Sequence, residues 1–349
     1  MHRMAIMRTD EQGTPMTTFD RSRRAVLALA PAVFAPGALL VGARARAQDR
    51  PTIRIGTHIS ISAHLFMQKK PELMKRLGKS YDVEWTRFSG SGDAMPALVA
   101  GKLDACLATA FPMANAINQS HVPVTIVHQL LSFGFDGHYD DYTVVRADSG
   151  INKVEDLKGK VFGINAIGGT VEQGVRIIAR KHGLDPDRDI TFIEARPPFL
   201  GTMVRDNKIQ AATLFQPFYE QTAAKGDVKV LFKDSDIYGG PTDYVFMAFD
   251  NKFLKTHPQA VRDYVEDYLT AVNWSLDNRA EAVRIYAEQW KLPVSVVDSY
   301  LLTKKDYLVR RDGKVSAKAI QPVVDALAGA GFVAPIDVAK YLDLAYLPK

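Results

Sequence analysis

Short apolar runs alternate with helix-like segments along the first part of the chain. Strands are predicted at 52–58 (TIRIGTH), 81–88 (YDVEWTRF), 103–109 (LDACLAT) and 122–131 (VPVTIVHQLL). The segment 65–78 (LFMQKKPELMKRLG), between the first two strands, is predicted to be a helix. Such alternation is typical of α/β proteins with mostly parallel sheets.

The middle of the chain repeats this scheme, and the last third changes to helices. Further strands are predicted at 159–165, 190–195, 209–215 and 228–232, with a helix at 170–182. After about residue 257, apolar residues recur at helical spacing, as in Val261, Val265, Leu269 and Val272. On that helix we expect three aromatic residues to pack against the core: Tyr264, Tyr268 and Trp274.

Two segments of the chain resemble each other. AGKLDACLATAFP (100–112) and DNKIQAATLFQP (206–217) each contain a polar turn, an apolar strand and a proline that opens the next helix. About 300 residues also exceed what one core usually organises, so two similar lobes are expected. Open α/β sheets bind ligands beyond the carboxyl ends of their strands, and two facing sheets would form a cleft there.

The N-terminus has the order of an export signal. Arg23 and Arg24 precede an uncharged run, AVLALAPAVFAPGALLVGA, and an A-x-A site ends at Ala47. Pro31 and Pro36 interrupt the run, which argues against a membrane anchor. We therefore expect residues 1–47 to be a twin-arginine-type signal peptide, cleaved after Ala47, and the mature protein to be periplasmic.

Removal of this segment changes the charge balance. The chain has 44 basic and 39 acidic residues, and residues 1–47 contain seven arginines and three acids. The remaining chain therefore has 44 − 7 = 37 basic and 39 − 3 = 36 acidic residues. A nearly neutral chain gives little support for a nucleic-acid partner. The single cysteine, Cys106, lies in an apolar stretch and is expected to be a small buried residue.

The order of several motifs resembles the periplasmic substrate-binding proteins of ABC importers, in the nitrate/sulfonate/taurine (NMT1/Thi5-like) branch. These motifs are WTRFSGSGDAMPALVAGKLDACLATAFPMANA from residue 85, DSGINKVEDLKGKVFGINAIGGT from residue 148, KHGLDP from residue 181 and FQP at 215–217. The resemblance extends over nearly all of residues 50–349.

The resemblance implies a two-lobe type II periplasmic binding protein fold, in which each lobe is a mostly parallel sheet flanked by helices. Lobe 1 would comprise 50–145 and 240–349, with C-terminal helices, and lobe 2 would comprise 146–236. The crossings near 143–147 and 235–242 would form a hinge. It also implies a monomer that carries a small organic anion, a sulfonate or carboxylate, to an ABC permease in the inner membrane, without a cofactor and without catalysis.

The site residues are suggested by the same resemblance and by their positions at the carboxyl ends of the predicted strands. The first lobe would contribute His58, Ser60, Ser89, Gly90, Thr109 and Phe111. The second lobe would contribute Asn165, Gly168, Gly169, Thr170, Arg196, Phe215 and Gln216, and the returning strand Asp243 and Tyr244. Small polar groups beside aromatic side chains suit a pocket with a few placed hydrogen bonds.

The loop GINAIGGT (163–170) resembles a phosphate-binding loop without its lysine. Its free amides and the helix dipole favour an anionic ligand group. Glu172 competes for that dipole, so it either points away as an exposed helix-start acid, which we favour, or faces a positive group of the ligand. Arg196 is the strongest candidate for a permanent positive charge in the cleft.

Other functions remain as alternatives. Asp136, His138, Asp140 and Asp141 lie in one loop, 132–142, and could hold a metal, although a solvated polar loop is the favoured interpretation. No zinc-binding histidine spacing and no G-x-S-x-G motif is present in the sequence. An exported, metal-assisted enzyme, a periplasmic sensor and a protein that binds a thiamin-precursor pyrimidine are the alternatives on the same fold.

Overall fold

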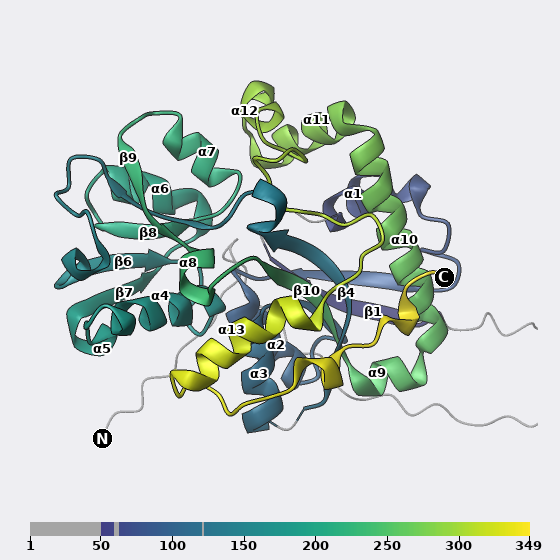
Figure 1. The fold of residues 1–349 in the computed structure, drawn as a ribbon. Coiled ribbons are helices and arrows are strands. Elements are labelled where there is room, and N and C mark those ends of the chain that lie inside the picture. Colours follow the sequence, from purple (N-terminus) through teal and green to yellow (C-terminus); the bar gives the residue numbers. More distant parts are fainter. Residues whose placement is uncertain (1–49, 59–62, 121) are drawn as a thin grey trace, which may run out of the picture. The chain divides into compact units, whose positions relative to one another are not determined.

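Two five-stranded sheets organise the protein (Figure 1). The computed structural model describes residues 50–58, 63–120 and 122–349, so the signal-peptide prediction for residues 1–47 lies outside the described residues. The first sheet has the order β2 (Asp82–Arg87), β1 (Thr52–Thr57), β3 (Ala105–Ala108), β10 (Thr242–Asp250), β4 (Val124–Phe133). The second has the order β7 (Ile190–Glu194), β6 (Lys160–Ile164), β8 (Ala211–Leu214), β5 (Tyr142–Arg146), β9 (Val228–Lys233).

The two sheets have the same topology. β1 and β6 each lie parallel to two neighbours, and β10 and β5 each run antiparallel to both of theirs. Four strands of each sheet therefore share one direction, which confirms the prediction of mostly parallel sheets. The fifth strand of each sheet, β10 or β5, runs in the opposite direction. The two similar sequence segments form β3 and β8, which occupy the same position in their sheets.

Helices cover both sheets, and we call each sheet with its helices a lobe. The first lobe carries α1 (His64–Lys69), α2 (Ser91–Val99), α3 (Ala110–Asn115), α9 (Asn251–Thr256), α10 (Pro258–Asp277), α11 (Arg279–Trp290), α12 (Val294–Asp298) and α13 (Ala317–Gly329). The second carries α4 (Thr170–Lys181), α5 (Pro186–Asp189), α6 (Pro197–Arg205), α7 (Phe218–Ala223) and α8 (Asp234–Tyr238). Short 3₁₀ turns lie at Pro71–Leu73, Phe135–Gly137, Val154–Leu157, Val338–Tyr341 and Leu344–Tyr346, and a π turn at Ala116–Ser120. No helix within the described ranges has the length and apolar character of a membrane span.

The apolar periodicity in the last third forms α10, as predicted. Tyr264 and Tyr268 are fully buried, and Trp274 is partly buried against the same core. The first predicted helix is wrong beyond Lys69, because Pro71 disfavours helical backbone at Lys70 and the chain continues as a 3₁₀ turn. Cys106 lies on β3 with no exposed surface, and its burial raises the pKa of the thiol to about 12.

Candidate functional site

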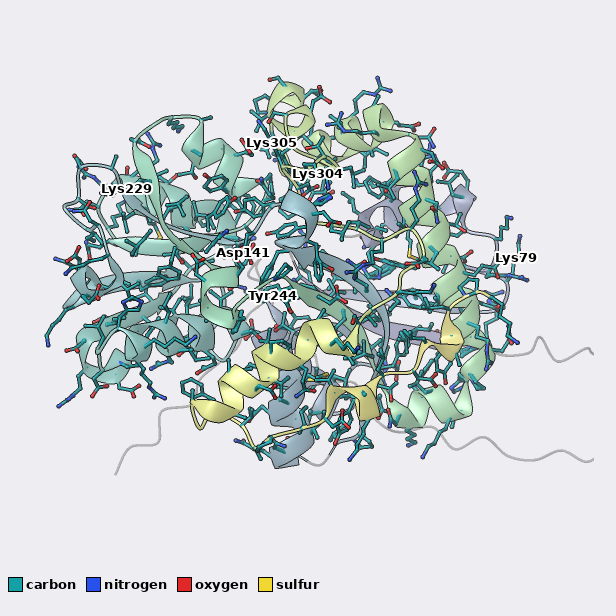
Figure 2. The ribbon with its side chains drawn as sticks, viewed as in Figure 1. Lys79, Asp141, Lys229, Tyr244, Lys304 and Lys305 are labelled. Atoms are coloured by element: carbon teal, nitrogen blue, oxygen red, sulfur yellow. The ribbon has the colours of Figure 1, made fainter. Side chains whose placement is uncertain are left out.

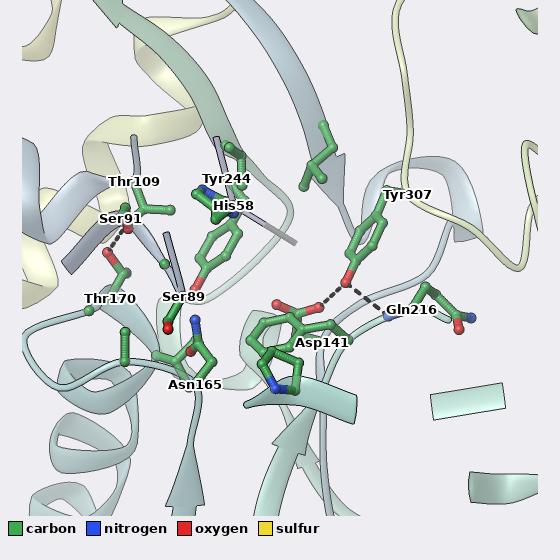
Figure 3. Close-up of a pocket in the computed structure, with 18 of the residues that line it drawn as sticks. His58, Ser89, Ser91, Thr109, Asp141, Asn165, Thr170, Gln216, Tyr244 and Tyr307 are labelled. Carbon is green, nitrogen blue, oxygen red and sulfur yellow. Dashed lines mark hydrogen bonds between the residues drawn. The ribbon is translucent and has the colours of Figure 1, made fainter. Parts of the chain in front are cut away.

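A cavity lies between the facing ends of the two sheets (Figure 3). Its walls come from residues that follow β1, β2 and β3 in the first lobe and β6, β7 and β8 in the second. It offers about 60 Å³ to the centres of water-sized spheres, which is room for several water molecules or a small solute. This is where open α/β sheets place their ligands.

Ten of the residues that the sequence suggested line this cavity. From the first lobe these are His58, Ser89, Gly90, Thr109 and Tyr244, and from the second Asn165, Gly169, Thr170, Phe215 and Gln216. Four of them, His58, Thr109, Asn165 and Phe215, directly follow a strand, so the parallel arrangement of the strands brings these four together. Ser60 lies outside the described residues.

Arg196 does not lie at the cavity. Its side chain is exposed and forms no ion pair with any residue that the structure describes. Arg196 is the N-cap of α6 and has extended backbone, and the next residue, Pro197, is the first of the helix and lines the cavity. The side chain of Arg196 faces solvent.

Three other suggested residues support the walls without lining them. Asp243 is buried in a polar cluster, where its carboxylate accepts hydrogen bonds from Ser132 Oγ at 2.5 Å, Ser316 N at 2.6 Å and the Arg310 guanidinium. Phe111 lies on α3, half-buried against the core. Gly168 has a φ of +73°, which glycine adopts without strain, and its amide donates to Glu172.

Hydroxyl groups join the two lobes at one end of the cavity. Thr170 Oγ1, on the second lobe, donates to Thr109 Oγ1 on the first lobe at 2.8 Å, and it accepts from Phe111 N at 3.0 Å. Thr109 Oγ1 also contacts Ser91 Oγ at 2.6 Å. These contacts connect the start of α4 to the starts of α2 and α3.

Glycines allow the loop GINAIGGT to approach the first lobe closely. A Cβ on Gly92 would lie 2.7 Å from Ile167 O and 3.1 Å from Gly169 N, both backbone atoms. A Cβ on Gly90 would lie 2.7 Å from the side-chain nitrogen of Asn165. The SGSGD segment and the loop are therefore in backbone contact, which only glycine at position 92 permits.

Glu172 is buried, so the expectation of an exposed helix-start acid is wrong. Only 5% of it is exposed, and it does not line the cavity. Its carboxylate accepts from Gly168 N at 2.8 Å and from Arg176 at 2.8 Å and 2.9 Å. Glu172 therefore stabilises the loop from behind, and Arg176 balances its charge.

The favoured interpretation of the loop 132–142, a solvated polar loop, is wrong for Asp140 and Asp141, whereas Asp136 is exposed and His138 is half-buried. Asp140 is 3% exposed and Asp141 is 1% exposed. Asp140 accepts from Ser235 N at 3.2 Å, and Asp141 accepts from Tyr307 Oη at 2.6 Å and lines the cavity. The carboxylates pack at the two crossings between the lobes.

His58 is a neutral side chain at neutral pH. Its Nε2 is buried and has no hydrogen-bond partner among the residues that the structure describes. Burial lowers the pKa of the imidazole to about 4. A charged imidazolium that binds an anion, the role considered from the sequence, is therefore disfavoured, whereas a neutral donor or acceptor remains available.

Comparisons with known proteins identify the family. The sequence profile of the NMT1-like family matches residues 46–289. The chain belongs to the NMT1-like family. A comparison with curated protein sequences gave no match.

Solved structures similar to this family member have the two-lobe periplasmic binding protein fold. The alkanesulfonate-binding protein SsuA from Xanthomonas axonopodis pv. citri, bound to MOPS, has a TM-score of 0.68 and 19% identity over 84% of this chain and 99% of that chain. The periplasmic nitrate-binding protein NrtA from Synechocystis PCC 6803 has a TM-score of 0.64 and 16% identity over 85% and 87%. The desulfurization enzyme DSZB has a TM-score of 0.58 and 12% identity over 85% and 97%. At these identities the likeness establishes the fold, which binding proteins and an enzyme share.

Sequence reasoning missed several wall residues of this family member. Most are apolar or small and carry no chemical signal: Ser91, Leu131, Ala166, Val171, Pro197, Phe218 and Val245. Tyr307 comes from the irregular segment between α12 and α13, far in sequence from every motif. Asp141 was considered only as a metal ligand, although two adjacent acids directly before a buried strand are an unusual signal.

Proposed function

We propose that this protein is the solute-binding component of an ABC importer. It captures a small organic solute in the cavity between its lobes and delivers it to a permease in the inner membrane. The observation that carries this proposal is the cavity itself, which both lobes line at the carboxyl ends of their strands. Closure of two lobes around a ligand gives a permease a surface that differs between the loaded and empty protein.

The export signal supports the same function. An arginine pair, an uncharged run and the A-x-A site that ends at Ala47 direct the mature chain to the periplasm, where such a component acts. We propose that it works there as a monomer. The solved neighbours named for periplasmic nitrate binding and alkanesulfonate binding share its fold.

The start of α4 supports an oxygen-rich acceptor group on the ligand, such as a sulfonate or carboxylate. Gly169, Thr170 and Val171 line the cavity, and amides in a first helical turn have no acceptor within their own helix. The helix dipole favours negative charge at this end. The negative charge of Glu172 does not cancel this preference for an anionic group, because Arg176 pairs with Glu172 outside the cavity.

The decisive experiment identifies what the protein carries. Native mass spectrometry of the mature protein, purified without denaturation, should show a bound small molecule. At a concentration of 100 times its Kd, that molecule should stabilise the refolded, ligand-free protein by about 2.7 kcal/mol in a thermal-shift assay. Absence of both a bound molecule and any stabilisation across a panel of organic acids would contradict the proposal.

The same material separates binding from catalysis. A binding protein returns its ligand chemically unchanged after hours of incubation, as measured by liquid chromatography and mass spectrometry. Conversion of the ligand by the purified protein would instead assign an enzyme to this fold.

A further inference from the structure

One carboxylate oxygen in the wall of the cavity has no partner within the described part of the chain. Asp141 precedes β5, is 1% exposed and lines the cavity. Its Oδ1 accepts a hydrogen bond from Tyr307 Oη at 2.6 Å. Its Oδ2 is buried and has no hydrogen-bond partner among the described residues. A buried carboxylate oxygen without a donor costs free energy, so among the described residues this oxygen is left for a donor from elsewhere.

The wall side chains that the structure describes include no lysine or arginine to pair with this carboxylate. Residues 59–62, beside the site in sequence, read Ile-Ser-Ile-Ser and cannot carry a charge. In Figure 2, Asp141 and Tyr244 lie between the two sheets, Lys79 and Lys229 lie near the edges, and Lys304 and Lys305 lie above the middle. Neither Lys304 nor Lys305 lines the cavity, and Lys304 Nζ donates to Asp136 O at 2.8 Å.

Two further buried acids stand close to Asp141. Asp234 N donates to the backbone oxygen of Asp141 at 3.1 Å, and each of Asp140 and Asp234 also has one carboxylate oxygen without a partner among the described residues. Burial raises the pKa of Asp141, and the neighbouring Asp140 raises it further. The field at this end of the cavity therefore favours a positive group or an N–H donor over an anion.

We propose that Asp141 binds a cationic or N–H donor group of the solute, such as an ammonium, amidinium or ring amino group. The solute then carries its donor group at the Asp141 end and its oxygen acceptor at the start of α4. Figure 3 shows the carboxylate of Asp141 apart from the Ser91–Thr109–Thr170 hydroxyls, with Tyr244 and Ser89 between them. Tyr307 holds the carboxylate in place and leaves Oδ2 for the ligand.

This inference rests on the proposed binding function and narrows its ligand class. It distinguishes a solute with both groups from a simple organic anion, which would not stabilise the ionised carboxylate of Asp141 and would be repelled by it. A charge-assisted hydrogen bond from the ligand would also remove the cost of the unpartnered oxygen.

Matched probes that differ only in an amino group test the inference. The mature protein, freed of any carried molecule, is titrated by calorimetry with aminopropanesulfonate against propanesulfonate, and with aminomethylbenzoate against methylbenzoate. The amino member of at least one pair should bind roughly ten- to a hundredfold more tightly. The variant Asp141→Asn should lose most of that preference, because the amide has a single acceptor oxygen and no charge.

The control is Asp148→Asn, which removes an exposed carboxylate just after the same strand and should keep the wild-type preference. Equal or weaker binding of both amino probes by the wild-type protein overturns the inference, even if Asp141→Asn fails to fold. An unchanged preference in a folded Asp141→Asn variant also overturns it. These two results overturn only the role of Asp141, and the proposed binding function stands if native mass spectrometry detects a carried molecule. If native mass spectrometry detects no molecule and none of the probes binds, the proposed function fails as well.

Discussion

The carboxylate of Asp267 fixes the turn 75–81 on α10. It is fully buried and accepts hydrogen bonds from the amides of Lys75, Arg76 and Leu77 and from Tyr81 Oη, at 2.8–3.3 Å. One side chain on a helix therefore satisfies three backbone donors of an irregular segment.

Asp267→Asn should lower the free energy of unfolding by about 2–4 kcal/mol. The amide places an NH₂ group against backbone donors and leaves at least one of them without an acceptor. The control is Asp277→Asn on the same helix, where the carboxylate is exposed and paired with Arg311, and the loss should stay below about 1 kcal/mol. Urea denaturation measures the free energy of unfolding of both variants. Equal losses of this free energy would show that the turn does not depend on Asp267.

His128 makes stability depend on pH in the acid range. It is fully buried, its Nδ1 lies 3.0 Å from Gln129 O, and burial lowers its pKa to about 4. The unfolded chain binds a proton below about pH 6.5, whereas the folded protein does so only near pH 4. The free energy of unfolding should therefore fall as pH decreases from about 6.5 to 4, by up to about 1.4 kcal/mol per pH unit for this one group.

The variant His128→Gln should have a shallower slope over that range, whatever its absolute stability. Asp306 contributes a slope of opposite sign, because burial raises its pKa to about 7 and its folded form binds the extra proton between about pH 4 and 7. Asp306 is present in both proteins, so its contribution cancels in the difference between their urea-denaturation profiles, which reports His128 together with its effect on the neighbouring His64. Parallel profiles would show that His128 does not titrate on unfolding.

At the scale of elements, α2 and the loop before α4 depend on the absence of a side chain at Gly92. Gly92→Ala should stabilise α2 in itself, since alanine is a better helix former by about 1 kcal/mol. The added methyl group would nevertheless meet Ile167 O and the backbone at Gly168 and Gly169, which cannot rotate away. The lobes should therefore separate at this contact.

Small-angle X-ray scattering of the ligand-free protein should show a larger radius of gyration for Gly92→Ala than for the wild type. Gly329→Ala, at the exposed end of α13 where a Cβ meets nothing within 4 Å, serves as the control and should not change the radius. Identical radii for the two variants would mean that the loop adjusts without separation of the lobes.

The elements were predictable where local pattern decides them. Apolar runs specify β1, β3, β6 and β8, and helical spacing specifies α10, because burial of one face is a property of the sequence itself. The parallel order then brings their carboxyl ends together, so Thr109 and Thr170 could be predicted at one site although 61 positions separate them.

The rest of the site depends on features that no local pattern contains. At the start of α6, Pro197 lines the cavity and Arg196 faces solvent, and the sequence does not fix which of the two faces the cavity. Tyr307 reaches Asp141 across 166 positions from an irregular segment. Burial of Glu172 beside Arg176 likewise follows from the packing of α4 and not from its position in a first turn.

At the scale of the molecule, the largest cluster of buried apolar residues continues from one lobe into the other. It includes Ile53 and Phe246 of the first sheet and Phe162 and Ile164 of the second. α13 packs against α3 and β10 of the first lobe and against α4 and α8 of the second, as Figure 1 also shows. A smaller cluster around Leu200 and Leu214 lies on the second sheet only.

This continuity predicts one cooperative unfolding transition for the mature protein. All three tryptophans, Trp85, Trp274 and Trp290, belong to the first lobe, and Trp290 also packs on Phe218 of the second. Fluorescence therefore reports the first lobe and this one contact with the second, whereas far-ultraviolet circular dichroism reports both lobes. If the shared core couples the lobes, the two signals should have the same midpoint in urea. The variant Gly92→Ala should keep that coincidence, because its clash lies at the cavity and leaves α13 in place. A dichroism change that precedes the fluorescence change would show that the second lobe unfolds alone and that the small cluster around Leu200 limits its stability.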